Sequence, residues 1–346
     1  MTSRRRLLGG MLSLAVLGGA PGRARADAPL SILNRDRNIR ESVLGEFSRR
    51  ARLELDYQVV ASAAEITAVL REDPARFDLV VLPSAVLERM AQEERLQPLD
   101  PTLLTNLANV AGPFADPPFD PGMRFGVPYL WGAWGIGYTE LKASRPRRWD
   151  DVLLTDLYAG DIHLPAVPEI VRLLAKIAGG SANTTLPDEI ENAARLLARL
   201  RPKLKSTDPE RGPDLLSVGQ VAVSILPSEL IQPRRAGDGT LGFVVPLDGS
   251  ILTVDSLAIP KAARHPEAAH RFIDFVLEPK IHAQIATALR AGCPNAPAMI
   301  HIPQPMRVDR SVYPKRETMA RLEPLRWTGY EAERLYEAAL VKALAA

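Results

Sequence analysis

Residues 118–138 read PFDPGMRFGVPYLWGAWGIGY, and this stretch decides the fold. Its first half contains the tripeptide Asp-Pro-Gly at 120–122, which is typical of a turn because proline presets φ and glycine tolerates positive φ. Its second half, residues 127–138, is apolar and aromatic but carries three glycines between positions 132 and 137. Glycine within a strand marks a bulge or a close backbone approach. The stretch is either a core strand with weak points or, as we expect, a strand that passes between two lobes through a hinge.

Four further short motifs follow the same order as in one known family. They are FDLVV at 77–81, NTT at 183–185, VDSLAIP at 254–260 and CPN at 293–295. Together with residues 118–138, they resemble the periplasmic spermidine/putrescine-binding proteins, the substrate receptors of ABC importers. The resemblance implies an α/β, two-lobe periplasmic binding protein fold of type II with hinge strands between the lobes. It also implies ABC permease subunits of the inner membrane as partners and a monomeric receptor.

The first 26 residues have the features of a cleavable signal peptide. Three arginines at 4–6 precede a short apolar run at 7–17, and Ala-Arg-Ala at 24–26 offers a cleavage site. The apolar run is shorter than the ~20 residues that a membrane-spanning helix needs. The arginines predict twin-arginine export, with an arginine-rich Sec signal as the alternative. Both routes predict a periplasmic protein, and no cysteine stands near the cleavage site to carry a lipid anchor.

Charge, cysteine content and length narrow the class of protein. The chain has 43 Lys and Arg against 41 Asp and Glu, and the leader contains five of the arginines and no acid. The mature chain therefore has a charge balance of −3, unlike the clustered positive surplus of a nucleic-acid-binding protein. Cys293 is the only cysteine, so no disulfide can form within the chain. The length after the leader favours two lobes over a single core.

Strand and helix patterns alternate along the chain, which predicts βαβ units. In the N-terminal part we expect strands at 30–33, 53–59 and 77–82, and helices at 39–50, 63–72 and 84–94. In the C-terminal part we expect strands at 162–164, 221–226, 243–245 and 254–259, and helices at 187–200, 265–289 (broken by Pro279) and 331–345.

The order of these elements and the resemblance lead to a division of the mature chain into two lobes. We expect residues 27–130 and 256–299 to form the first lobe, and residues 131–255 and 300–346 to form the second. The hinges are expected at residues 132–137 and 253–256. Two hinged lobes enclose a cleft, where receptors of this type bind their ligand.

The chain shows no pattern for catalysis, a metal or a cofactor. It lacks a P-loop, a dinucleotide fingerprint and a Gly-x-Ser-x-Gly elbow. Its five histidines are scattered, and their spacings do not place two of them on one ligand face of a helix. We therefore predict a binding protein rather than an enzyme, with no cofactor.

The resemblance also places the ligand site. The family binds polyamines with carboxylates that pair with ammonium groups and aromatic rings that stack on methylenes, which adds cation–π attraction. Glu169 and Asp255 match family carboxylates, but arginine, asparagine and threonine replace several of the aromatic residues. The candidate ligand-binding residues are Arg35, Asp36, Arg37, Asn38, Ser84, Glu169, Thr253 and Asp255.

These substitutions leave the class of ligand open between a polyamine and a smaller zwitterionic or anionic, amino-acid-like metabolite. Arg35 and Arg37 precede a helix, whose first N–H groups favour an anion, while Asp255 suits an ammonium group. Alternatively, both arginines point to solvent or pair with Asp36, and Glu169 and Asp255 serve as structural carboxylates. A sensory or interaction protein that has lost transport is the alternative from another class.

Overall fold

The computed structural model describes residues 28–35 and 39–345. A mixed ten-stranded sheet runs through the molecule in the order β2-β1-β3-β9-β4-β7-β5-β6, with β10 beside β9 and β8 beside β4. The strands are β1 (Leu30–Arg35), β2 (Leu55–Val60), β3 (Leu79–Pro83), β4 (Gly126–Thr139), β5 (Ile162–His163), β6 (Leu204–Ser206), β7 (Val223–Pro227), β8 (Leu241–Val244), β9 (Ser250–Ala258) and β10 (Leu322–Pro324).

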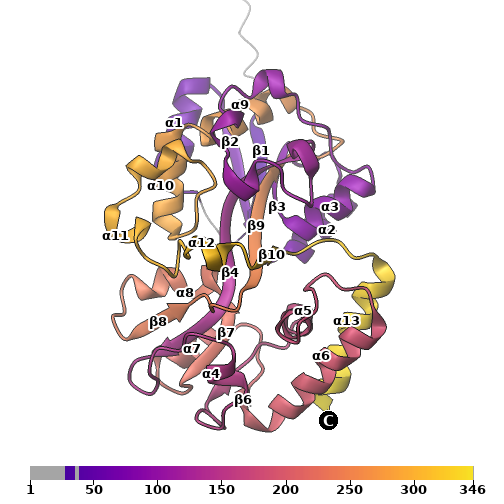
Figure 1. Cartoon of the computed structure of the whole chain (residues 1–346). Helices are drawn as coiled ribbons and strands as arrows, with labels where there is room; N and C mark the ends of the chain where they lie inside the picture. Colours follow the sequence, from indigo (N-terminus) through magenta and orange to yellow (C-terminus); the bar gives the residue numbers. More distant parts are fainter. Residues whose placement is uncertain (1–27, 36–38, 346) are drawn as a thin grey trace, which may run out of the picture.

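Helices cover both ends of this sheet (Figure 1). They are α1 (Glu41–Ala51), α2 (Ala63–Glu72), α3 (Ser84–Gln92), α4 (Asp150–Leu153), α5 (Pro168–Ile177), α6 (Pro187–Leu200), α7 (Gly212–Ser217), α8 (Ser228–Arg235), α9 (Pro266–Val276), α10 (Pro279–Leu289), α11 (Gln304–Arg307), α12 (Arg316–Met319) and α13 (Tyr330–Ala345). Short 3-10 turns are η1 (Pro101–Leu103), η2 (Leu107–Asn109), η3 (Gly112–Phe114), η4 (Pro121–Met123), η5 (Arg201–Lys203) and η6 (Pro297–His301). No described helix is long and apolar enough to cross a bilayer.

Strands β4 and β9 connect the two ends of the molecule (Figure 1). They pair antiparallel from Gly126 opposite Ala258 to Ala133 opposite Leu252. Beyond Ala133, β4 leaves β9 and pairs with β7 and β8 instead. Every residue of β4 is buried, so this strand belongs to the interior of both ends.

The buried apolar side chains form two large cores that meet along these strands. Trp131 and Val254 belong to the first core, whereas Trp134 and Ile251 belong to the second. A third, smaller core lies beneath α7 and α8. We propose that the two large cores mark the two lobes, with the boundary at residues 131–134 in β4 and 251–252 in β9.

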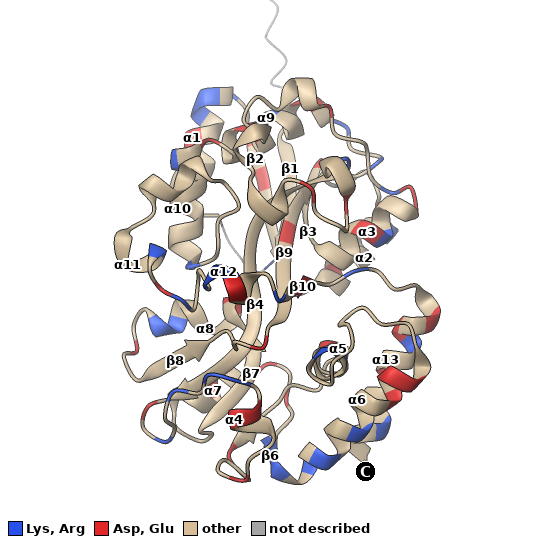
Figure 2. Ribbon diagram, viewed as in Figure 1, with Lys and Arg blue, Asp and Glu red and all other residues tan. Residues whose placement is uncertain are grey.

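The last part of the chain contributes to both cores. Ile302, Met306 and Val312 pack in the first core, whereas Tyr336 and Leu340 of α13 pack in the second. This packing supports the proposal that the chain passes from the first lobe to the second after residue 312 rather than at residue 300. As predicted, α13 packs on the second part of the fold, beside α6 and α5. Acidic and basic residues are spread over both ends of the molecule (Figure 2), and Lys342 of α13 pairs with Glu191 of α6 at 2.9 Å.

The glycines of β4 permit close approach rather than a bulge. The register irregularity of β4 lies between Pro128 and Leu130, outside the glycine run. A Cβ atom added to Gly135 would lie 2.3 Å from the carbonyl oxygen of Val244 in β8. One added to Gly132 would lie 2.3 Å from Ser228 Oγ at the start of α8. The glycines therefore let β8 and α8 lie directly against the strand.

The turn predicted ahead of β4 is present. Gly122 adopts a φ of +73°, and the Asp120 carboxylate accepts hydrogen bonds from the N–H groups of Phe125 and Gly126 at 3.0 and 2.8 Å. Burial raises the pKa of Asp120, against the opposing effect of these hydrogen bonds. The turn thus anchors the chain where it enters β4.

Substitution of Gly135 by alanine should test the close contact between β4 and β8. The added methyl group meets a backbone carbonyl that cannot rotate away, so Gly135→Ala should lower the free energy of unfolding by roughly 1–3 kcal/mol. Gly239→Ala is the matched control because no atom lies within 4 Å of its added Cβ. Equal stability of the two variants in denaturant unfolding would contradict this account.

His282 of α10 is a fully buried, titratable group in the first half of the molecule. Its Nε2 lies 2.5 Å from the carbonyl oxygen of Tyr129 in β4, and its ring stacks on the Tyr129 ring at 6.1 Å. Burial lowers the pKa of His282 to about 4, against the opposing effect of the hydrogen bond to Tyr129. The ring is therefore neutral near pH 7 and donates from Nε2.

Stability should consequently fall with pH on the acid side of neutrality. The unfolded chain binds a proton at His282 near pH 6.5, whereas the folded chain does so only near pH 4. The contribution of the neutral His282 ring to the free energy of unfolding is therefore complete above pH 6.5 and is lost as the pH falls towards 4. Between pH 7.5 and 5 the free energy of unfolding should drop by about 2 kcal/mol from this residue alone.

Two variants test whether His282 causes this dependence of stability on pH, by denaturant unfolding at several pH values. His282→Gln keeps a donor for the Tyr129 carbonyl but cannot titrate, so its stability should depend less steeply on pH than that of the wild type. His301→Gln changes an exposed histidine and should keep the wild-type slope. A His282→Gln protein with an unchanged slope would refute the assignment.

Candidate functional site

The candidate site lies where three strands bring their polar side chains together at the centre of the sheet. β1 and β3 are parallel neighbours, so their carboxyl ends lie at the same edge, and they end at Arg35 and Pro83. Pro83 is paired with Asp255 of β9, and Ser84 follows it. The topology therefore gathers Arg35, Ser84 and Asp255, as expected for ligand sites at the carboxyl ends of strands.

Arg35 and Asp255 form an ion pair. The NH2 nitrogen of Arg35 lies 3.2 Å from Oδ1 and 3.4 Å from Oδ2 of Asp255. The Asp255 side chain is 4% exposed and that of Arg35 is 20% exposed. Water screens the attraction between these two charges less than it does between charges at the surface. It ties the end of β1 to the middle of β9.

Glu169 comes from the second part of the fold, in the first turn of α5. Burial raises the pKa of Glu169, whereas its own backbone N–H, Arg172 and Arg35 oppose this effect. Arg172 is itself buried and pairs with Glu333 at 2.5 Å. Arg35, at the end of β1, therefore acts on Glu169, at the start of α5, through its charge.

Thr253 contacts a carboxylate that the sequence analysis missed. Thr253 Oγ1 lies 3.4 Å from Glu229 Oε2, and Glu229 stands in the first turn of α8. The preceding Ser228 accepts a hydrogen bond from the N–H of Ala133 in β4, at 3.2 Å, which fixes the start of α8 against the hinge region. The available signal was an acid two residues after a buried strand, near the carboxyl end of β7.

Ser84 and Glu88 of α3 hold the segment that follows β10. Ser84 is buried, and its hydroxyl donates to the carbonyl oxygen of Leu325 at 2.7 Å. Glu88 accepts from Arg326, with Nε at 3.0 and 2.9 Å from its two oxygens, and from the Trp327 N–H at 2.8 Å. We call these contacts the α3 clamp. They join the first core to the segment leading to α13.

The predicted site residues thus divide into three groups. Arg35 and Asp255 are in direct contact, so the prediction that the Arg35 side chain points to solvent is wrong, whereas the alternative of a pairing with Asp36 involves a residue outside the described ones. Glu169 lies within electrostatic reach of Arg35, Thr253 lies beside Glu229, and Ser84 is engaged in the α3 clamp. Their roles in ligand binding stay predictions. Asp36, Arg37 and Asn38 lie outside the described residues.

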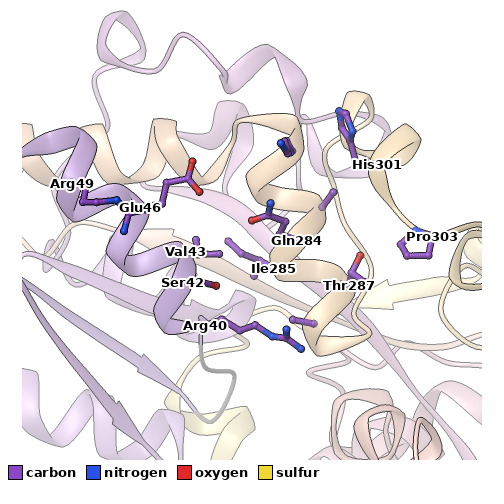
Figure 3. A pocket seen from close by; sticks show the side chains of 13 residues that line it. Arg40, Ser42, Val43, Glu46, Arg49, Gln284, Ile285, Thr287, His301 and Pro303 are labelled. Atoms are coloured by element: carbon purple, nitrogen blue, oxygen red, sulfur yellow. The ribbon is translucent and has the colours of Figure 1, made fainter.

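A separate cavity of about 720 Å³ lies between α1 and α10 in the first part of the fold. Figure 3 shows Arg40, Glu46, Gln284, Thr287 and His301 around it. Glu169, Glu229 and Asp255 do not line this cavity, so it is distinct from the candidate site. Within residues 28–35 and 39–345, no group of three His, Cys, Asp or Glu side chains is arranged to hold a metal ion.

Sequence comparison connects this geometry to a known family. The family described as bacterial extracellular solute-binding protein matches residues 76–312. The chain is 28% identical over 322 residues to the spermidine/putrescine-binding periplasmic protein of Escherichia coli, covering 92% of this chain and 91% of that protein. It is 26% identical over 330 residues to the putrescine/cadaverine-binding protein of Pseudomonas aeruginosa, covering 91% and 93%.

Structural comparison gives the same result. The crystal structure of the substrate-binding protein of a spermidine/putrescine ABC transporter from Streptococcus pneumoniae matches with a TM-score of 0.85 at 26% identity. The match covers 91% of this chain and 98% of that one. It confirms the expected two-lobe α/β fold. The chain therefore belongs to the family of bacterial extracellular solute-binding proteins.

Proposed function

We propose that this protein is the solute receptor of an ABC importer of the spermidine/putrescine type and binds a small amine-bearing molecule between its lobes. The observation that carries the proposal is the set of carboxylates at the junction of the two cores. Asp255 is buried in the middle of β9, Glu229 stands beside Thr253 of the same strand, and Glu169 approaches from α5. Relatives named for binding putrescine, cadaverine and spermidine support an amine as the ligand.

The electrostatics of the site favour a cationic group on the ligand. Burial raises the pKa of Glu169, so its charged form is destabilised in the free protein. An ammonium group placed beside it would stabilise that charge through charge-assisted hydrogen bonds. Because the site draws residues from both ends of the molecule, a ligand that binds all of them has the higher affinity for the closed arrangement.

The remaining parts of the proposal follow from the family. A solute receptor binds and releases its ligand without making or breaking a bond, so we propose no catalytic role. The partners would be ABC permease subunits, and the protein would act as a monomer outside the inner membrane. The proposed signal peptide lies outside the described residues.

Calorimetry with purified protein tests the amine site. Putrescine, cadaverine, spermidine and amino acids are first screened by thermal shift, since a ligand at 100 times its Kd adds about 2.7 kcal/mol to stability. For the ligand that binds, Asp255→Asn should weaken affinity by about 10- to 100-fold, because a hydrogen bond to a charged group contributes about 1.5–3 kcal/mol.

Glu210→Gln is the control for that substitution, because Glu210 is an exposed carboxylate between β6 and α7. Its affinity should equal that of the wild type. Failure of every amine to bind would contradict the proposed function, and undiminished affinity in Asp255→Asn would remove Asp255 from the site.

Small-angle scattering tests lobe closure and the oligomeric state together. The forward scattering should correspond to the mass of one chain. Saturation with the ligand should reduce the radius of gyration, because the ligand stabilises the closed arrangement. A dimer mass, or identical curves with and without a ligand that calorimetry shows to bind, would contradict this prediction.

A further inference from the structure

Arg35 places a cation of the protein itself against the most buried carboxylate of the site. Both oxygens of Asp255 lie within 3.4 Å of the Arg35 NH2 nitrogen. The Asp255 side chain is almost completely buried, so few directions of approach to it remain. An ammonium group that approached Asp255 would therefore also lie next to the Arg35 guanidinium, and the two like charges would repel each other.

The same guanidinium is well suited to a ligand carboxylate. Its planar, fork-shaped array of donors matches the geometry of a carboxylate, which the compact ammonium group of a lysine does not. The Arg35 side chain is five times more exposed than that of Asp255, at 20% against 4%, so it lies nearer to the solvent side of the pair. A carboxylate on the ligand would add to the favourable interactions of Arg35, whereas a second ammonium group would oppose them.

Carboxylates for the amine end of such a ligand are present within the same site. Glu169 interacts electrostatically with Arg35 from the other end of the molecule. Glu229 lies beside Thr253, and Thr253 is two residues from Asp255 and on the same face of β9. Among the described residues, Arg35 thus lies in a site with several carboxylates, and Arg172, the other cation that acts on Glu169, is paired with Glu333. This arrangement is the complement of a molecule that carries both charges.

We propose that Arg35 determines the specificity of the cleft by disfavouring simple diamines at Asp255 and selecting an amine that also carries a carboxylate. This inference rests on the proposed function and narrows its ligand class to aminocarboxylates. Arg35 acts as a direct contact to the carboxylate of the ligand, and its ion pair with Asp255 holds the guanidinium in position.

The experiment compares the binding of putrescine, γ-aminobutyrate and ornithine by calorimetry. γ-Aminobutyrate has a carboxylate in place of one amine end of putrescine, and ornithine has two amino groups and a carboxylate. The wild type should bind γ-aminobutyrate or ornithine at least tenfold more tightly than putrescine. Arg35→Gln should weaken binding of the aminocarboxylates at least tenfold and strengthen binding of putrescine. Arg35→Lys keeps the positive charge but loses the planar array of donors. It should therefore weaken binding of the aminocarboxylates without strengthening binding of putrescine.

Arg40→Gln is the matched control, because Arg40 is an exposed arginine at the start of α1 that lines the separate cavity. It should bind all probes as the wild type does. If Arg35→Gln does not fold, the comparison of Arg35→Lys with the wild type still decides the matter.

The outcomes separate the inference from the proposed function. A wild type that prefers putrescine, or position-35 variants with unchanged relative affinities, would overturn the role of Arg35 and leave an amine receptor. Absence of binding for all three probes and for the polyamines would overturn the proposed function, and the inference with it.

Discussion

The structure depends on the antiparallel pairing of β4 with β9. This pairing starts in the first core and reaches the edge of the second, so the backbone hydrogen bonds of two strands connect both ends of the molecule. It also places Thr253 and Asp255 on one face of β9, close to the position where this strand passes from one core to the other. Because β4 is buried along its whole length, Gly132 and Gly135 are needed to admit α8 and β8.

The ion pair between Arg35 and Asp255 gives this scaffold its chemical character. Without Arg35, β9 would present a buried carboxylate, that of Asp255, at this position. Arg35 adds a cation beside that carboxylate, and the planar donors of a guanidinium match the geometry of a carboxylate. The α3 clamp, built from Glu88 and Arg326, adds a further connection between the first core and the segment leading to α13. The site is therefore a property of contacts between distant parts of the chain.

The sequence predicted the elements whose signal is local. The bounds of α2 and α6 are those expected, and Pro279 separates α9 from α10, because capping residues, apolar periodicity and proline act within one or two turns. It did not predict β10, which has three residues and exists only because β9 lies beside it. Glu229 was missed although it follows a buried strand, because its contact with Thr253 becomes visible only when α8 packs against β4.

For the site, the resemblance supplied Glu169 and Asp255 as residue types at family positions. The sequence contains no motif typical of catalysis and no surplus of positive charge typical of nucleic-acid binding. By itself, the sequence determined an α/β receptor with two lobes and a glycine-rich strand between them, and it predicted a ligand site poor in aromatic residues. Only the tertiary structure decided that Arg35 binds Asp255, 220 residues away along the chain. The physical reason is that strand order, not sequence separation, determines which charges meet. In the sheet, β3 lies between β1 and β9, so the end of β1 comes close to the middle of β9.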